Sequence, residues 1–280
     1  MKLLKTNFLY TAFVMLALAF TSCETEAPTK SSLNNYVGIE TSKYVGVLLD
    51  QTVTVDTKVV ATDVSNVDRT FNLVVDPSST HDAAYYNVPA TVIIPAGQKV
   101  GVFQTVITGS NLGGGKILVV GLETEVGVDY ALTGYTLDTA GLVTAVKANK
   151  VTYTIDRVCE TGLSKVKLSI TFDNYPEETA WELYDSSLNV IDSGGFDASG
   201  NIIGNPGTGY AALFADKGTL KTSFCLASGD YTFVIYDAYG DGLYTSASVE
   251  GNYSVKLGET VLASGQGDFG TSQATTFNIP

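Results

Sequence analysis

The sequence has 280 residues and a formal net charge of −13 at pH 7, with few Met, Trp and His residues. No stripe of Lys or Arg is present to neutralise phosphates, so the composition argues against a nucleic-acid-binding protein. Abundant Gly, Thr, Val and Tyr favours short strands over helices. The length suffices for about two domains.

The first 22 residues have the layout of a secretory signal peptide. Lys2 and Lys5 precede an apolar run, and small residues follow it before Cys23. The apolar run is short for a membrane span of about 20 residues, which disfavours a transmembrane anchor. The polar, Pro-containing segment 23–35 is expected to form a flexible tether.

The segment FTSC, which ends at Cys23, resembles a bacterial lipobox. The resemblance implies that residues 1–22 are removed and that Cys23 carries acyl chains such as palmitate. We therefore expect a lipoprotein of the bacterial cell envelope, held at the outer membrane on its periplasmic or surface face.

Residues 36–157 read as a series of short strands with turn clusters between them. The segment 52–61 alternates apolar and polar residues, the period of a half-buried strand. Regular short strands of this kind predict an antiparallel sandwich. The other predicted strands are 70–75, 90–97, 100–108 and 116–123.

The phrases YNVPATVIIPAG and VTYTIDR in this region resemble Calx-β and immunoglobulin-like modules of bacterial surface lipoproteins. The resemblance implies a non-catalytic spacer or adhesive sandwich over residues 36–157.

Residues 158–280 predict a second all-β domain. Val166, Leu168, Ile170 and Phe172 alternate with polar residues, and later strand-like runs are separated by turn signals. The whole chain is thus predicted to be all-β, with two antiparallel β-sandwich domains in series, the first of them immunoglobulin-like.

Cys159 and Cys225 are the two cysteines beyond the lipobox. In an oxidising compartment such a pair favours a disulfide, and two buried free thiols are the alternative.

The loop that begins at Asp237, with the sequence DAYGDG, raises the question of a metal site. Asp237 and Asp241 stand at its first and fifth positions, and Tyr239 at the third. An EF-hand is excluded because a strand-like run precedes the loop and Ser248 stands where Glu is needed. Taken alone, the loop is more simply an Asp-Gly turn.

A second acidic loop, TFDNYPEET, also follows a strand-like run. Asp173, Asn174, Glu177 and Glu178 could lie beside Asp237 and Asp241 if the strands that precede the two loops are neighbours. Acids gathered in this way repel one another unless a cation neutralises them.

Together the two motifs resemble a β-sandwich module appended to secreted bacterial proteases and surface proteins, in which D-x-Y-P-x-E-T-x-W and D-x-Y-G-D-G recur. The resemblance implies a non-catalytic, jelly-roll-like accessory domain with a calcium site at Asp173, Asp237 and Asp241. Asn174, Glu178 and Tyr239 complete the candidate ligand set.

Aromatic residues near these loops are candidates for ligand contact. Trp181 could stack on a sugar, although a core position is the simpler interpretation. Tyr239 and Tyr244 flank the glycine loop and are the better, still weak, candidates.

Enzymatic activity is not expected. His81 is the only histidine, and we expect it in a surface turn. A G-x-S-x-G elbow and the usual zinc ligands are both missing from the sequence. The leading hypothesis is a non-catalytic, lipid-anchored spacer with a calcium-stabilised binding or adhesion module whose partner is an envelope protein. A glycan-binding accessory lipoprotein for polysaccharide uptake is the alternative, and a hydrolase is a remote third.

Overall fold

The computed structural model describes residues 36–123, 131–137, 143–146, 149–204 and 209–280. The expected signal peptide (1–22), the lipidation residue Cys23 and the tether (23–35) lie outside the described residues. Within the described part, no helix has the length and apolar character needed to cross a membrane.

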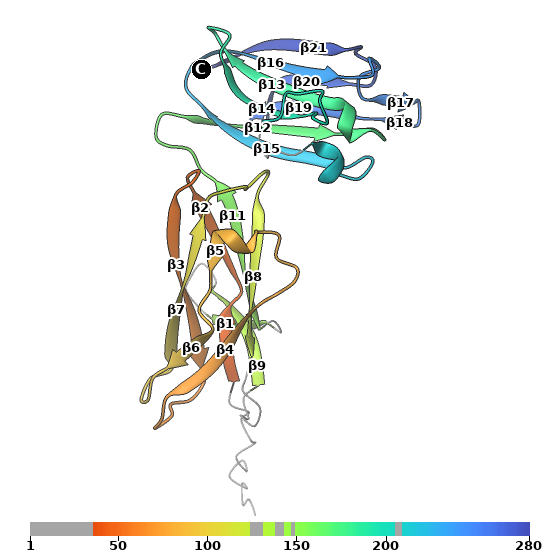
Figure 1. Ribbon diagram of the computed structural model, residues 1–280. Coiled ribbons are helices and arrows are strands. Elements are labelled where there is room, and N and C mark those ends of the chain that lie inside the picture. The colour runs from red at the N-terminus through yellow and green to blue at the C-terminus, as the bar shows by residue number, and fades with distance from the viewer. Residues whose placement is uncertain (1–35, 124–130, 138–142, 147–148, 205–208) are drawn as a thin grey trace, which may run out of the picture. The chain divides into compact units, whose positions relative to one another are not determined.

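The prediction of an all-β protein is confirmed, and the strands divide into two groups with separate hydrophobic cores (Figure 1). The first group makes a six-stranded sheet in the order β10-β9-β1-β3-β7-β5 and a five-stranded sheet in the order β2-β11-β8-β4-β6. Its strands are β1 (Tyr36–Glu40), β2 (Ser42–Val47), β3 (Thr52–Ala61), β4 (Arg69–Val75), β5 (Tyr86–Asn87), β6 (Thr91–Ile94), β7 (Val100–Thr108), β8 (Lys116–Glu123), β9 (Ala131–Leu137), β10 (Val143–Val146) and β11 (Lys150–Arg157), with the 3-10 helix η2 (Ala83–Tyr85) before β5.

The first sandwich is not wholly antiparallel, which differs from the prediction. β1 pairs with β9, and β2 with β11, in parallel. Parallel pairing requires a long connection between the partners, and here most of the domain separates each pair along the chain. A break at Thr41 separates β1 from β2, so that this segment contributes an interior strand to the six-stranded sheet and an edge strand to the five-stranded sheet.

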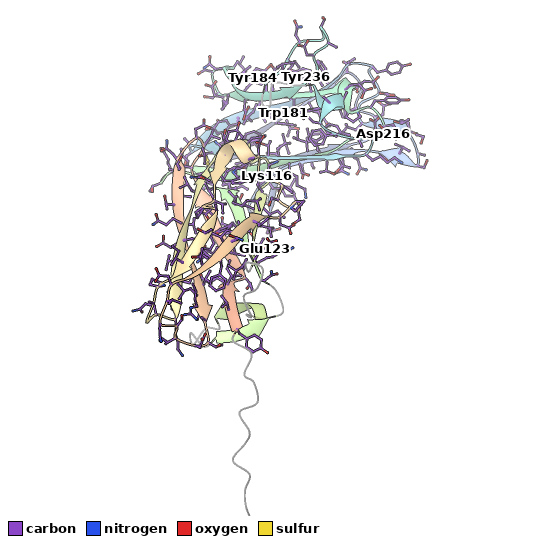
Figure 2. All side chains as sticks on the ribbon, turned by 60° about the horizontal axis from the view of Figure 1, so that its bottom comes forward. Lys116, Glu123, Trp181, Tyr184, Asp216 and Tyr236 are labelled. Atoms are coloured by element: carbon purple, nitrogen blue, oxygen red, sulfur yellow. A yellow bond between two sulfur atoms is a disulfide. The ribbon has the colours of Figure 1, made fainter. Side chains whose placement is uncertain are left out.

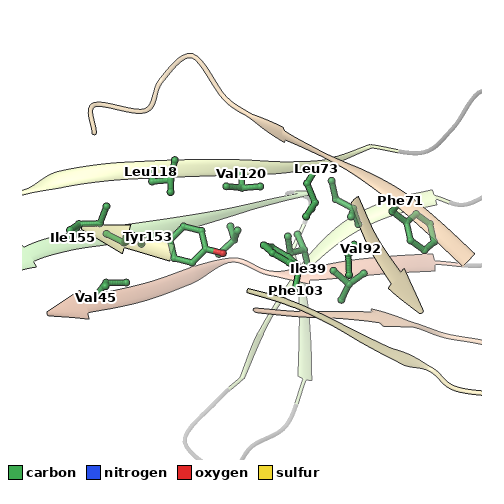
Figure 3. Packing of buried hydrophobic residues seen from close by; sticks show 14 of the residues in the cluster. Ile39, Val45, Phe71, Leu73, Val92, Phe103, Leu118, Val120, Tyr153 and Ile155 are labelled. Atoms are coloured by element: carbon green, nitrogen blue, oxygen red, sulfur yellow. The ribbon is translucent and has the colours of Figure 1, made fainter. Parts of the chain in front are cut away.

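A hydrogen-bond network crosses the first core at Tyr153, whose hydroxyl lies among apolar side chains (Figure 3). It lies 2.7 Å from the hydroxyl of Thr57 and 3.0 Å from that of Thr105. All three residues are fully buried. Thr57 and Thr105 lie on β3 and β7 of one sheet and Tyr153 on β11 of the other, so the network joins the two sheets and satisfies polar groups that would be costly to bury alone.

The second group of strands forms two four-stranded antiparallel sheets, in the orders β15-β12-β19-β20 and β14-β13-β16-β21, with a small β17-β18 ribbon. Eight strands in two facing sheets match the expected sandwich. The strands are β12 (Ser164–Thr171), β13 (Thr179–Asp185), β14 (Val190–Gly195), β15 (Thr219–Leu226), β16 (Gly229–Asp237), β17 (Tyr244–Ser246), β18 (Val249–Glu250), β19 (Asn252–Leu257), β20 (Thr260–Gln266) and β21 (Ser272–Ile279), and the 3-10 helices are η3 (Pro176–Glu178) and η4 (Tyr210–Ala212).

The alternation of apolar and polar residues that predicted β12 matches the burial of its side chains. Val166, Leu168 and Ile170 are buried in the second core, while the residues between them are more exposed. Phe172, one step further along, is buried beside the rings of Tyr210 and Phe214.

A disulfide joins Cys159 and Cys225, with Cα atoms 5.5 Å apart. It ties the segment that enters β12 to β15, the strand that pairs with β12 along its whole length. Such a cross-link stabilises a fold chiefly by restricting the unfolded chain.

Candidate metal centre

The register between β13 and β16 brings the two acidic loops together. Thr179, the first residue of β13, stands opposite Asp237, the last residue of β16. The backbone NH of Ala238 donates to the carbonyl of Glu178 at 2.8 Å. The 3-10 turn before β13 therefore lies directly against the loop that follows β16.

Three carboxylates converge at this junction. Oxygen atoms of Glu178, Asp237 and Asp241 lie within 4.8 Å of one another. Asp237 is buried, and the other two are partly exposed. We call these three residues the acid corner.

Asp237 also shapes the loop that carries Asp241. Its Oδ1 accepts hydrogen bonds from the backbone NH groups of Gly240 and Asp241. The loop can turn this tightly because Gly240 and Gly242 adopt φ angles of +98° and +74°, a left-handed conformation that glycine tolerates best. Gly242 is also confined, since a Cβ there would lie 2.6 Å from the carbonyl oxygen of Gly267.

Burial and mutual repulsion disfavour ionisation of two carboxylates of the acid corner, those of Glu178 and Asp237. Burial, followed by the charges of Asp237, Asp241 and Asp173, raises the pKa of Glu178 to about 6. Burial is also the main cause that raises the pKa of Asp237, although backbone hydrogen bonds oppose it. Both pKa shifts are in the direction expected for carboxylates that have no positive charge nearby.

A divalent cation fits this environment. Oδ1 of Asp241 is buried and has no hydrogen-bond partner in the described structure, a costly state for a carboxylate oxygen. Calcium takes about six to eight oxygen ligands and accepts carboxylates and backbone carbonyls from loops. Glu178, Asp237 and Asp241 would hold it, and its charge would relieve the repulsion among them.

Asp173 lies outside this group of three, in contrast to its expected place as a ligand. It is 3% exposed, and both of its carboxylate oxygens accept hydrogen bonds. Oδ1 accepts from the NH of Tyr175 at 2.9 Å, and Oδ2 from the hydroxyl of Thr245 at 2.9 Å. Asp173 thus links its loop to β17 and adds negative charge near Glu178.

Two other predicted ligands, Asn174 and Tyr239, are not among the three carboxylates that converge. The backbone NH of Asn174 donates to the Thr245 hydroxyl at 3.5 Å. The side chain of Tyr239 is 78% exposed, so its ring lies in solvent. Tyr244 is partly buried in β17.

Trp181 is not a surface platform. It is 2% exposed, its indole NH donates to the hydroxyl of Tyr210 at 2.7 Å, and its ring packs against Phe224 and Phe233. The idea that Trp181 stacks on a sugar is therefore wrong, and the core interpretation of this residue holds.

His81 is not a surface turn residue, and that expectation is wrong. It is 4% exposed, and its Nε2 lies 3.2 Å from the carbonyl oxygen of Thr108. The neighbouring ring of Tyr85 lies 6.0 Å away between centroids. Burial lowers the pKa of His81. The residues around His81 correctly predicted a turn of the backbone, but they did not reveal that the imidazole ring is buried.

A second polar cluster was missed at the sequence level. Glu182 and Tyr184 on β13 lie beside Tyr236 on β16, and Figure 2 shows the two tyrosines close together. Oε2 of Glu182 accepts from the hydroxyl of Tyr184 and, at 2.8 Å, from that of Tyr236. The run WELY signals that Glu182 and Tyr184 share the face opposite Trp181, but only the register reveals Tyr236.

Comparisons with known proteins give no family. No protein-family model matches the chain, and no curated protein matches it. The chain is similar to a solved protein of unknown function from Bacteroides ovatus (13% identity, covering 87% of this chain and 95% of that chain, TM-score 0.33).

It is also similar to an auxiliary nutrient binding protein from Bacteroides thetaiotaomicron (10% identity, 85% and 91% coverage, TM-score 0.30). A third is CBD12 from CALX1.2 (8% identity, 72% and 78% coverage, TM-score 0.32). Identities and TM-scores this low carry no argument about function, which therefore rests on the residues of this chain.

Proposed function

We propose that the chain is a non-catalytic, lipid-anchored binding protein of the bacterial cell envelope, and that calcium stabilises its C-terminal sandwich. The convergence of Glu178, Asp237 and Asp241, with a buried oxygen of Asp241 lacking a partner, is the observation that carries the calcium site. The lipid anchor rests on the sequence around Cys23.

The cation would act on shape rather than on chemistry. It would join the turn before β13 to the loop after β16, two segments that carry net negative charge and otherwise repel. Loops fixed on a rigid sandwich are the usual place for recognition of a partner. An envelope protein is the partner we favour.

One observation favours a saccharide as a second candidate ligand. Tyr239 is 78% exposed on the loop of the acid corner, and an exposed aromatic ring can stack on a sugar. Loss of polysaccharide binding in Tyr239→Ala, with retention in Tyr175→Ala, another exposed tyrosine, would favour this class. Equal binding by both variants would remove it.

Thermal melting of the full chain with calcium and with a chelator tests the calcium site. Binding to the folded state alone must raise stability by mass action, by about 2.7 kcal/mol at a calcium concentration 100 times the dissociation constant. Asp241→Asn should abolish the calcium-dependent rise. In chelator this variant should be at least as stable as the wild type, because it removes one repelling charge.

Glu259→Gln is the matched control, since Glu259 is an exposed acid in a turn away from the acid corner. It should retain the full calcium response. A calcium response that is absent from the wild type, or that survives in Asp241→Asn, would refute the site.

A further inference from the structure

The cluster of Glu182, Tyr184 and Tyr236 lies on the outer face of the sheet β14-β13-β16-β21. On β13 the inward residues Trp181 and Leu183 are buried, whereas Glu182 and Tyr184 are partly exposed. On β16 the neighbours of Tyr236 on either side are buried, whereas Tyr236 is partly exposed. This face is separate from the acid corner and has no role in the proposed calcium site.

The hydrogen bonds of the cluster use all of its donors. The hydroxyl of Tyr184 and the hydroxyl of Tyr236 both donate to Oε2 of Glu182. The two hydroxyl oxygens lie 3.2 Å apart. A tyrosine hydroxyl has a pKa of about 10, so both tyrosines keep their protons at neutral pH.

The oxygen atoms of the cluster can still accept further hydrogen bonds. Oε1 of Glu182 makes no hydrogen bond among the described residues. Each tyrosine hydroxyl, having given its proton to Glu182, still has lone pairs that can accept. The cluster therefore offers three neighbouring acceptor oxygens and no donor.

The charge of the cluster is also uncompensated. None of the ion pairs in the described part of the chain involves Glu182. Across the sheet, β21 places the small exposed residues Ser272 and Ala274 opposite Tyr236 and Val234, so the side chains on the β21 side of the cluster are small.

We propose that Glu182, Tyr184 and Tyr236 form a binding site for a primary ammonium group. A primary ammonium carries one positive charge and three N–H donors, which match one carboxylate and three acceptor oxygens. A quaternary ammonium lacks the donors, and calcium requires more oxygens than the cluster provides.

The amine could belong to a lysine side chain of a partner protein or to an amino sugar. Both sources present the same group, so the site chemistry is tested first with n-butylammonium. Nα-acetyl-lysine amide and glucosamine then distinguish the two sources.

The test is NMR of the full chain with ¹³C-labelled tyrosine rings, titrated with n-butylammonium at neutral pH in chelator. Tyr184→Phe and Tyr236→Phe assign the two ring signals. We expect saturable shifts of those two signals. Affinity should fall roughly tenfold or more in Glu182→Gln, which removes a charge-assisted hydrogen bond, and severalfold in either Phe variant. Glu259→Gln, the control acid, should behave as the wild type.

n-Butanol and tetramethylammonium are the matched ligand controls, because the first lacks the charge and the second lacks N–H donors. Neither should shift the two signals at comparable concentration. The proposal is overturned if n-butylammonium gives no saturable shift, if Glu182→Gln binds it equally well, or if tetramethylammonium binds as tightly. Failure here would leave the calcium response of Asp241 untouched, so the two proposals are judged separately.

Discussion

Among single residues, the polar side chains of the two sandwiches differ in whether their hydrogen-bonding groups are satisfied. In the first core, Thr57, Thr105 and Tyr153 satisfy one another across the sandwich. In the second, Glu178, Asp237 and Asp241 gather like charges and leave Asp241 Oδ1 without a partner. A network whose polar groups are all hydrogen-bonded stabilises a fold, whereas a carboxylate oxygen without a partner is a candidate ligand for a cation.

The burial of His81 predicts that the stability of the protein depends on pH. Its pKa is lowered in the folded state by burial, so the unfolded chain binds a proton more readily than the folded chain. Stability is therefore retained above the unfolded value of about 6.5 and is lost as the pH falls below it. Relative to His81→Gln, the wild type should become progressively less stable from pH 7 to pH 5.5, as measured by urea denaturation.

Comparing the two proteins at each pH removes the contribution of Glu178, which titrates in the same range in both. A constant difference in unfolding free energy across this range would contradict the assignment of His81 as a buried, neutral imidazole.

At the scale of elements, the glycine turn after β16 sets the position of Asp241. Gly242→Ala should destabilise the protein by about 3 kcal/mol, because it adds a left-handed backbone penalty to a clash with Gly267. Chemical denaturation measures this loss.

Gly258→Ala is the control, since Gly258 also has a positive φ, +57°, but nothing lies within 4 Å of a Cβ placed there. It should cost only about 1 kcal/mol. Equal losses in the two variants would show that the close approach to Gly267 does not constrain the loop.

Most of the strands could be predicted from the sequence, but their partners could not. The predicted boundaries of β3, β7 and β8 coincide with those observed, because period-two alternation between turn signals is a local property. The parallel pairs β1–β9 and β2–β11 depend on contacts between distant segments, and nothing local distinguishes them from antiparallel pairs.

The same limit explains the outcome at the candidate site. The sequence identified two acidic loops and predicted that they meet if the strands preceding them are neighbours. Those strands, β12 and β16, lie in different sheets, and the loops meet because β13, which follows the first loop, pairs with β16. The sequence could not show that the carboxylate oxygens of Asp173 accept hydrogen bonds from Tyr175 and Thr245, since Thr245 lies 72 residues away. Tyr236 was missed as a partner of Glu182 for the same reason, at a separation of 54 residues.

At the scale of the whole molecule, the proposed role needs an anchor as well as a binding module. If Cys23 is lipidated, the chain should fractionate with membranes in a bacterial host, and mass spectrometry of the N-terminal peptide should show acyl chains on Cys23. Cys23→Ser should release the protein from the membrane fraction, because the acyl chains supply the membrane affinity.

Ser22→Ala keeps a small residue before the cysteine and should remain anchored. An unmodified Cys23 thiol, or membrane association of Cys23→Ser equal to that of the wild type, would contradict the lipid anchor.

Calorimetric titration of the chelator-treated chain measures whether the acid corner binds calcium. One calcium ion per chain should bind at this site. Affinity should fall about tenfold in Asp241→Asn, which loses a charged ligand, and should be unchanged in Glu259→Gln. A wild-type chain that binds no calcium, or an Asp241→Asn variant that binds it equally well, would show that the acid corner is not a calcium site.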